Sequence, residues 1–244
     1  MYKMGRILLI VFGTFYRTIY YFTKILIYSH QKNKDYDKTF QLIKKASINS
    51  IKTARVSMEV EGLENIPKED GFIYYPNHQG LFDVLMFFAS SPRCFSFVIK
   101  KEASKVILLK QIIAATGSLV MDRKDLRQSV KVIEEMIVAV KAKRNFLIFA
   151  EGTRSKNGNQ LLDFKAGSFK AAMRSECPIV PCALIDSYRP FDEKGIKPLT
   201  VKLIYLPAIP YEEYKNCKSN EIALMVKGRI EKAIAETLDK EKTL

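Results

Sequence analysis

The stretch YYPNHQGLFDVLMFF (residues 74–88) decides how this chain folds and where its chemistry lies. The apolar run GFIYYP (71–76) leads into it and predicts a buried strand, whereas LFDVLMFF predicts the start of a helix. His78 then lies in the strand-to-helix turn, and Asp83 lies in the first turn of the helix. The sequence contains only two histidines, so a carboxylate close to one of them marks a candidate site.

Two interpretations of His78 and Asp83 remain open at this point. On a continuous helix, side chains five residues apart would point about 140° away from each other. A turn that folds back, with Gly80 supplying backbone freedom, would instead let the carboxylate bond one imidazole nitrogen and leave the other to accept a proton. No serine or cysteine nucleophile lies beside this pair, so a general base here would act on a nucleophile that the substrate brings. The alternative is a capped helix start, in which Asp83 stabilises the first amides and His78 is a surface turn residue.

The rest of the chain alternates between strand-like and helix-like patterns. Runs with strand character, most of them continuously apolar as in strands covered on both faces, lie at 56–62, 94–99, 118–121, 145–150, 179–185 and 200–206. Helical patterns occupy a stretch ending near residue 54 and the segments 82–90, 102–117, 125–143, 164–176 and 221–240. This alternation predicts a single α/β domain with a mixed, largely buried sheet flanked by helices.

Polar residues gather after the strand predicted at 145–150, in the stretch FAEGTRS (149–155). The carboxyl ends of strands in α/β sheets are where ligands bind. Thr153, Ser155 and the main-chain amides near Gly152 can donate to a phosphate, and Arg154 can bind it bidentately. The alternative is a turn with an exposed ion pair between Glu151 and Arg154.

Two other stretches carry weaker signals. GSLVMDR (117–123) is a strand ending in a charged pair, which is either part of the same site or a surface ion pair of Asp122 with Arg123. CPIVPCAL (177–184) is a core strand bounded by prolines, with a role in shaping an acyl groove as the second interpretation.

The composition favours anionic partners and argues against metal. Lys and Arg outnumber Asp and Glu by 40 to 26, a formal charge of +14 that suits nucleic acid, an anionic membrane surface or phosphorylated small molecules. No nucleic-acid-binding motif is present, so we expect no nucleic-acid partner. The four cysteines lack C-x-x-C spacing, so we expect reduced thiols, no metal site and a reducing, cytoplasmic-side setting.

The N-terminal segment (1–32) is expected to associate with a membrane, and residues 33–244 to form the α/β domain. Its uninterrupted apolar part (7–16) is too short to span a bilayer, which needs about 20 apolar residues. On one helix, Arg6, Arg17 and Lys24 would fall within about 20° of each other as a stripe of cations. This pattern favours an amphipathic helix lying in the membrane surface. A tilted transmembrane helix and a helix packed on the protein itself are the alternatives.

The positive charge continues past this segment. No Asp or Glu occurs before Asp35, and an anionic lipid surface would attract Lys32, Lys34 and Lys38. We therefore expect the protein on the cytoplasmic face of a membrane, in contact with anionic lipids.

Four ordered blocks resemble those of the membrane glycerolipid acyltransferases, and within them the 1-acylglycerol-3-phosphate (lysophosphatidate) acyltransferases. The residues that match are Asn77, His78 and Asp83; Gly117, Leu119, Asp122 and Arg123; Phe149 and Glu151 to Ser155; and Val180 and Pro181. The resemblance covers roughly residues 55 to 210. Gly80 stands where the family often has Ser, and Ala150 where it usually has Pro; neither change removes a reactive group.

The resemblance implies a reaction and roles for the matching residues. His78, oriented by Asp83, would deprotonate the sn-2 hydroxyl of lysophosphatidate, and the oxygen would attack the thioester of acyl-CoA or acyl-carrier protein to give phosphatidate. No metal or bound cofactor is implied. Another acceptor, such as glycerol 3-phosphate or a different lysophospholipid, and a non-catalytic lipid-binding protein remain the alternatives.

The same resemblance implies where the substrates are held. Glu151, Gly152, Thr153 and Arg154 would bind substrate. Arg154 and Arg123 would meet the phosphate, and Lys100 or Lys101 would add positive charge.

Overall fold

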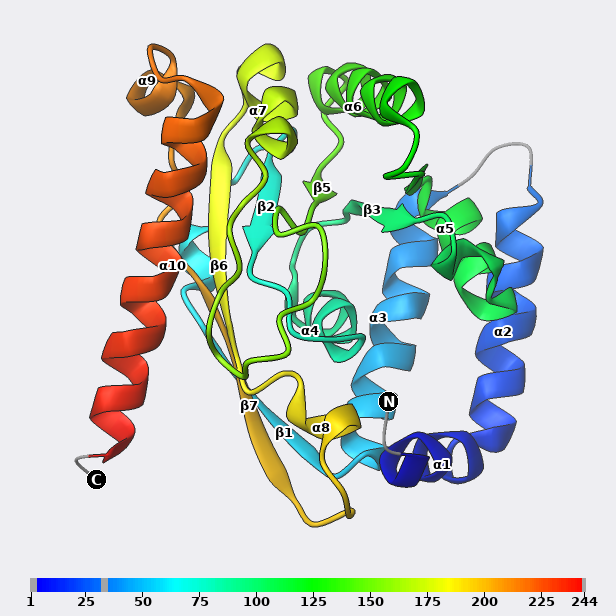
Figure 1. The fold of residues 1–244 in the computed structure, drawn as a ribbon. Helices are drawn as coiled ribbons and strands as arrows, with labels where there is room; N and C mark the ends of the chain where they lie inside the picture. Colours follow the sequence, from blue (N-terminus) through cyan, green and yellow to red (C-terminus); the bar gives the residue numbers. More distant parts are fainter. Residues whose placement is uncertain (1–3, 32–34, 243–244) are drawn as a thin grey trace.

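The computed structural model describes residues 4–31 and 35–242, and its centre is a seven-stranded sheet (Figure 1). The strands are β1 (Val56–Glu61), β2 (Ile73–Pro76), β3 (Ser96–Lys100), β4 (Leu119–Met121), β5 (Phe146–Leu147), β6 (Ile179–Ile185) and β7 (Leu199–Tyr205). Each of the seven strand-like runs in the sequence forms one of these strands. Lys32 and Lys34, expected to face anionic lipid, lie outside the described residues.

The strand order places five carboxyl ends along one edge of the sheet. The order is β1-β7-β6-β2-β5-β3-β4. From β6 to β4 every neighbouring pair is parallel, whereas β7 runs antiparallel to β6 and β1 runs parallel to β7. Because parallel strands end at the same edge, the segments that follow β2, β3, β4, β5 and β6 can meet there. The predicted mixed sheet is confirmed.

Helices cover both faces of the sheet (Figure 1). The longer ones are α3 (Tyr36–Thr53), α4 (Phe82–Ser90), α5 (Ile107–Thr116), α6 (Leu126–Lys141), α7 (Lys170–Ser175) and α10 (Ser219–Lys242). Short helices, which the sequence patterns did not predict, are α8 (Arg189–Asp192) and α9 (Tyr211–Tyr214). As the sequence suggested, α5 ends where Gly117 takes a left-handed conformation with φ 61°.

The central strand β2 is buried on both faces, and its side chains alternate between two cores. Tyr74 packs in the core formed with α3, α4 and α5, whereas Ile73 and Tyr75 pack in the core formed with α6, α7 and α10. Burial on both faces explains the continuous apolar run in the sequence. It also makes β2 a rigid support for the turn that carries His78.

The N-terminal segment forms two helices, so the expectation of one helix is wrong. Helix α1 (Met4–Gly13) lies across the N-terminal end of α2 (Phe15–Ser29) (Figure 1). Thr14 separates the two helices, with a non-helical φ of −118° and ψ of 16°. The predicted stripe of three cations does not form either. Arg6 is only 3% exposed and donates to the carbonyl oxygens of Ala54 (3.1 Å), Gly195 (2.8 Å) and Lys197.

The described part of the N-terminal segment packs on the domain and still leaves apolar side chains in solvent. Ile25 of α2 is part of the core that contains α3 and α4. Large hydrophobic side chains on α1 and α2 remain exposed: Leu8, Val11, Phe12, Phe15, Tyr16, Ile19 and Tyr20. We call these seven residues the N-terminal apolar patch. None of the helices in the described part of the chain is long and apolar enough to cross a membrane.

Candidate active site

The turn after β2 brings His78 and Asp83 into direct contact. His78 Nδ1 lies 2.8 Å from Asp83 Oδ2, and the carboxylate is fully buried. The same oxygen accepts from the main-chain amides of Gln79 (2.7 Å) and Gly80 (3.0 Å). Asp83 therefore caps the turn and holds the imidazole at once, so the two interpretations of the sequence describe one arrangement.

Glycine is not needed at position 80 for the reason expected. Gly80 does not adopt a positive φ, and a β-carbon there would meet its nearest neighbour, the Tyr188 Cα, at an ordinary 3.8 Å. The fold-back comes from the three hydrogen bonds to Asp83 rather than from unusual backbone freedom.

The imidazole is held from a second side by the chain that follows β5. The rings of His78 and Phe149 stack with centroids 4.0 Å apart, and Ser155 N donates to His78 O at 2.8 Å. The His78 side chain stays 22% exposed. With Nδ1 bonded to Asp83, Nε2 is the nitrogen available to take a proton from a substrate.

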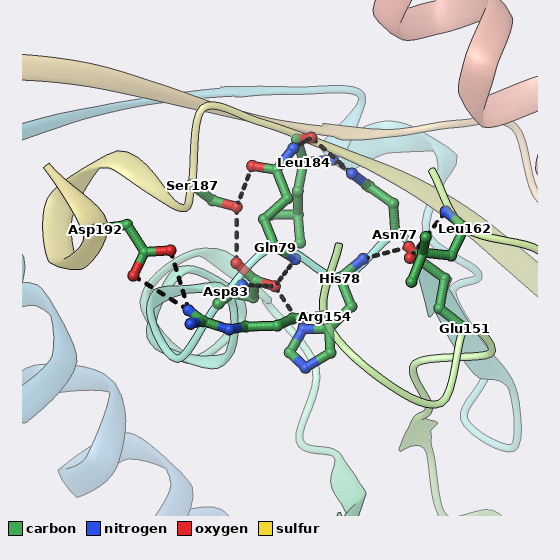
Figure 2. A network of polar contacts seen from close by, with 11 residues as sticks. Asn77, His78, Gln79, Asp83, Glu151, Arg154, Leu162, Leu184, Ser187 and Asp192 are labelled. Atoms are coloured by element: carbon green, nitrogen blue, oxygen red, sulfur yellow. Dashed lines mark hydrogen bonds and ion pairs between the residues drawn. The ribbon is translucent and has the colours of Figure 1, made fainter. Parts of the chain in front are cut away.

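Glu151 shapes the site through main-chain contacts. Its Oε1 accepts from His78 N at 2.7 Å and its Oε2 accepts from Leu162 N at 3.0 Å (Figure 2). Burial raises the pKa of Glu151 to about 6, and the two amide hydrogen bonds oppose that shift. Direct binding of substrate by Glu151 stays a prediction, because both oxygens already have donors.

Arg154 is directed toward α8. Its Nη1 lies 3.1 Å from Asp192 Oδ1 and 3.0 Å from Oδ2 (Figure 2). The ion pair with Glu151 that the sequence allowed is replaced by this one, because Glu151 is turned toward the two amides. Gly152 has φ 75° and Thr153 is exposed, in the turn that precedes Arg154.

The other predicted cations lie at the ends of β3 and β4. Lys101 Nζ bonds Asp122 Oδ2 at 3.0 Å, and this contact lowers the pKa of Asp122. Lys100 is exposed at the end of β3. Arg123 lines a cavity beside α6, so it has different neighbours from Arg154, and a phosphate shared by the two arginines stays a prediction.

Two cavities lie close to the site on opposite faces of the sheet: one is lined by Phe149, which stacks on His78, and the other by Leu81, in the turn that follows His78. A cavity of about 490 Å³ between α6 and α7 reaches Phe149 and Gly152, and we call it the α6/α7 cavity. Among the described residues, its lining includes four cations and no acidic residue: Arg123, Lys165, Lys170 and Arg174. A second cavity, of about 280 Å³, lies between α1 and α2 on one side and α3 and α4 on the other, and it reaches Leu81 and Val84. The part of its lining that the structure describes contains no charged residue. We call it the N-terminal cavity.

Several buried polar residues at this edge were not identified from the sequence. Ser187, between β6 and α8, is fully buried and lies 2.7 Å from Asp83 Oδ1. Gln79 Nε2 donates to Leu184 O and to Asn159 Oδ1. The one signal for Ser187 in the sequence is its place two residues after a buried strand, β6. Among the described residues, no group of three His, Cys, Asp or Glu side chains is placed to hold a metal ion.

Known proteins resemble this chain in both sequence and fold. Residues 57–185 match the acyltransferase family. A 1-acyl-sn-glycerol-3-phosphate acyltransferase of Helicobacter pylori is 31% identical over 121 residues, which are 50% of this chain and 51% of that protein. The corresponding protein of Escherichia coli is 31% identical over 170 residues, 69% of either chain.

The solved structure of the 1-acyl-sn-glycerophosphate (LPA) acyltransferase from Thermotoga maritima superposes with a TM-score of 0.78. It is 24% identical in sequence and covers 95% of both chains, which establishes the shared fold. The alignments span about half the length of the first curated relatives, such as those from Helicobacter pylori and Cocos nucifera. With more than half of its residues inside the matched region, the chain belongs to the acyltransferase family.

Proposed function

We propose that this protein transfers a fatty acyl group from a thioester to the sn-2 hydroxyl of lysophosphatidate, giving phosphatidate for phospholipid synthesis. The observation that carries the proposal is the His78–Asp83 pair, fixed at the carboxyl edge of the sheet between two apolar cavities. The names of the relatives from Helicobacter pylori and Escherichia coli support lysophosphatidate as the acceptor.

The reaction needs one base and no covalent enzyme intermediate. His78 Nε2 takes the proton of the acceptor hydroxyl while its oxygen attacks the thioester carbonyl carbon. Asp83 holds the tautomer through Nδ1 and stabilises the imidazolium that forms. The tetrahedral intermediate collapses to the ester, the carbon–sulfur bond breaks, and the leaving thiolate takes the proton back from Nε2. The base is regenerated, and no further reactant is required.

We assign the two cavities to different parts of the substrates. The cationic rim of the α6/α7 cavity is complementary to the phosphate and amide-containing arm of a thioester carrier, either acyl-CoA or acyl-carrier protein. The uncharged lining of the N-terminal cavity suits a hydrocarbon chain. The phosphate of lysophosphatidate is placed at Arg154, where it competes with Asp192 for the guanidinium group.

We propose that the N-terminal apolar patch rests in the surface of a membrane on its cytoplasmic face. Exposed aromatic and aliphatic side chains on α1 and α2 bury apolar area in the lipid interface. The charge of +14 supports anionic lipids as the partner surface. The N-terminal cavity lies directly behind these helices, so a lipid chain can pass from the bilayer toward His78.

A thioester-release assay over a panel of acceptors and both donor types tests this function. We expect turnover with lysophosphatidate, and His78→Ala should lower kcat by on the order of 100-fold or more. The second histidine, His30, lies at the end of α2 and is the matched control, so His30→Ala should keep full activity. Turnover with glycerol 3-phosphate alone would reassign the acceptor. No turnover with any pair, or an unimpaired His78→Ala variant, would refute the proposal.

A further inference from the structure

Ser187 contacts the carboxylate that holds the catalytic base, and it lies two residues beyond the matched family region, which ends at residue 185. Its side chain is fully buried, in the turn between β6 and α8. Figure 2 shows the Ser187 hydroxyl directed toward both Asp83 and Gln79. None of the sequence blocks that predicted the site includes this residue.

The hydrogen-bond partners of Asp83 divide between its two oxygens. Oδ2 accepts from His78 Nδ1 and from the amides of Gln79 and Gly80, whereas Oδ1 accepts from Ser187 Oγ at 2.7 Å. The carboxylate is fully buried, so water cannot replace a missing donor at Oδ1 without a change in packing. Ser187 therefore fixes the rotation of the carboxylate about its own axis.

The Ser187 proton has a second possible acceptor. Ser187 Oγ lies 2.8 Å from Gln79 Oε1, and the orientation of that amide is set because Gln79 Nε2 donates to the Leu184 carbonyl at 3.0 Å. A hydroxyl carries one proton, so Ser187 cannot donate to Asp83 and Gln79 together. An ionised carboxylate is the stronger acceptor, which favours donation to Asp83.

We propose that Ser187 is a positioning residue for the base, acting through Asp83. Its hydroxyl spreads part of the charge on Oδ1 and holds Oδ2 in line with His78 Nδ1. Without that donor, the full negative charge of Asp83 acts on the His78 imidazole and favours its protonated form. A smaller fraction of His78 is then free to accept a proton at a given pH, so deprotonation of the acceptor hydroxyl becomes less frequent. This inference rests on the proposed acyl transfer.

The test compares Ser187→Ala with Ser187→Thr, which keeps a hydroxyl. We expect Ser187→Ala to lower kcat about tenfold with little change in either KM, and to move the acid limb of the pH–activity profile toward higher pH. Ser187→Thr should restore most of kcat and the position of the limb. The matched control is Ser91→Ala, which removes another fully buried hydroxyl, bonded to Arg93 O and Tyr74 OH. That variant should keep the wild-type profile.

A double-mutant cycle separates action through Asp83 from a loss of folded protein. In an Asp83→Asn background, measured with a radiolabelled donor, Ser187→Ala should change kcat by less than about twofold. A tenfold loss in both backgrounds, or a loss that scales the whole pH profile without moving its acid limb, would overturn the proposal. Full activity of Ser187→Ala would also overturn the proposed role of Ser187, but it would leave the acyl-transfer function intact. An inactive wild-type protein would instead refute the acyl-transfer function itself.

Discussion

A change to the carboxylate of Glu151 is the strongest single test of how the loop after β5 supports His78, the proposed base. It is 2% exposed and binds the amides of His78 and Leu162, one with each oxygen. Glu151→Gln keeps the shape but replaces one oxygen with an NH2 group. One amide then faces another donor, so either the His78 segment or the Leu162 segment must shift. A shift of the base by a fraction of an ångström lowers kcat, and we expect a loss of about tenfold or more.

The same substitution has a predicted effect on the pH dependence of stability. Burial raises the pKa of Glu151 from 4.5 to about 6 in the folded protein, so between these values the folded state binds more protons than the unfolded state. The contribution of Glu151 to the free energy of unfolding is therefore fully present below the unfolded pKa and is lost as the pH rises through about 6. A shift of that size corresponds to about 2 kcal/mol.

Denaturant unfolding of wild type and Glu151→Gln at closely spaced pH values measures this contribution directly. All other titrating groups largely cancel in the difference between the two free energies. We expect that difference, wild type minus variant, to fall by about 1.5 kcal/mol between pH 4.5 and pH 6.5, which is most of the full contribution. A flat or rising difference would show that burial does not act on this carboxylate as described. Wild-type kcat in the variant would show that the Glu151–His78 contact does not position the base.

The remaining predictions concern the substrate contacts and the membrane. Arg154→Ala should raise the KM for lysophosphatidate at least tenfold and leave the donor KM nearly unchanged, with Arg229→Ala on α10 as the control; a rise confined to the donor KM would contradict the phosphate assignment. Val130→Trp places a larger side chain in the α6/α7 cavity and should raise the KM for the donor about tenfold, whereas Val138→Trp, at an exposed position on the same helix, should not. Equal effects of the two variants on the donor KM would exclude this cavity as the carrier site. The double variant Phe12→Glu, Tyr16→Glu should lower partitioning of the protein to anionic vesicles at least tenfold, measured by vesicle sedimentation, whereas Leu224→Glu, at another exposed apolar position, is the control. Unchanged partitioning of the double variant would show that another surface binds the membrane.

Contacts between residues close in sequence were predictable, and the contacts that complete the site were not. His78 and Asp83 are five residues apart, and the strand-turn-helix pattern around them fixes both positions. Ser187 reaches the same carboxylate from 104 residues away, and Arg6 reaches Lys197 from 191 residues away. Hydrophobic periodicity reveals which residues are buried, but it carries no information on which polar groups pair across the sheet.

The N-terminal segment is a second case in which the local sequence pattern did not predict a long-range contact. The helical wheel placed Arg6, Arg17 and Lys24 on one face, which holds only if a single helix continues through Thr14. The break at Thr14 changes the direction of the helix that precedes it, so Arg6 no longer shares a face with Arg17 and Lys24. The carbonyl groups that Arg6 binds belong to distant parts of the chain. The local pattern therefore identified an apolar segment correctly, and only the tertiary structure shows which cation turns inward.

The way Arg6 is bound suggests how this region can diverge during evolution. All three of its acceptors are main-chain oxygens, which every amino acid possesses, so the exposed side chain at position 197 is open to exchange as long as the backbone path is kept. Ala54 is fully buried in the core and Gly195 has φ 91°, so those two positions are restricted for reasons of their own. The donor has no such latitude, because a lysine ammonium group cannot reproduce the planar fork of a guanidinium. Substitutions should therefore accumulate at position 197 and spare Arg6. Lineages that lose Arg6 should also have altered how α1 attaches to the domain.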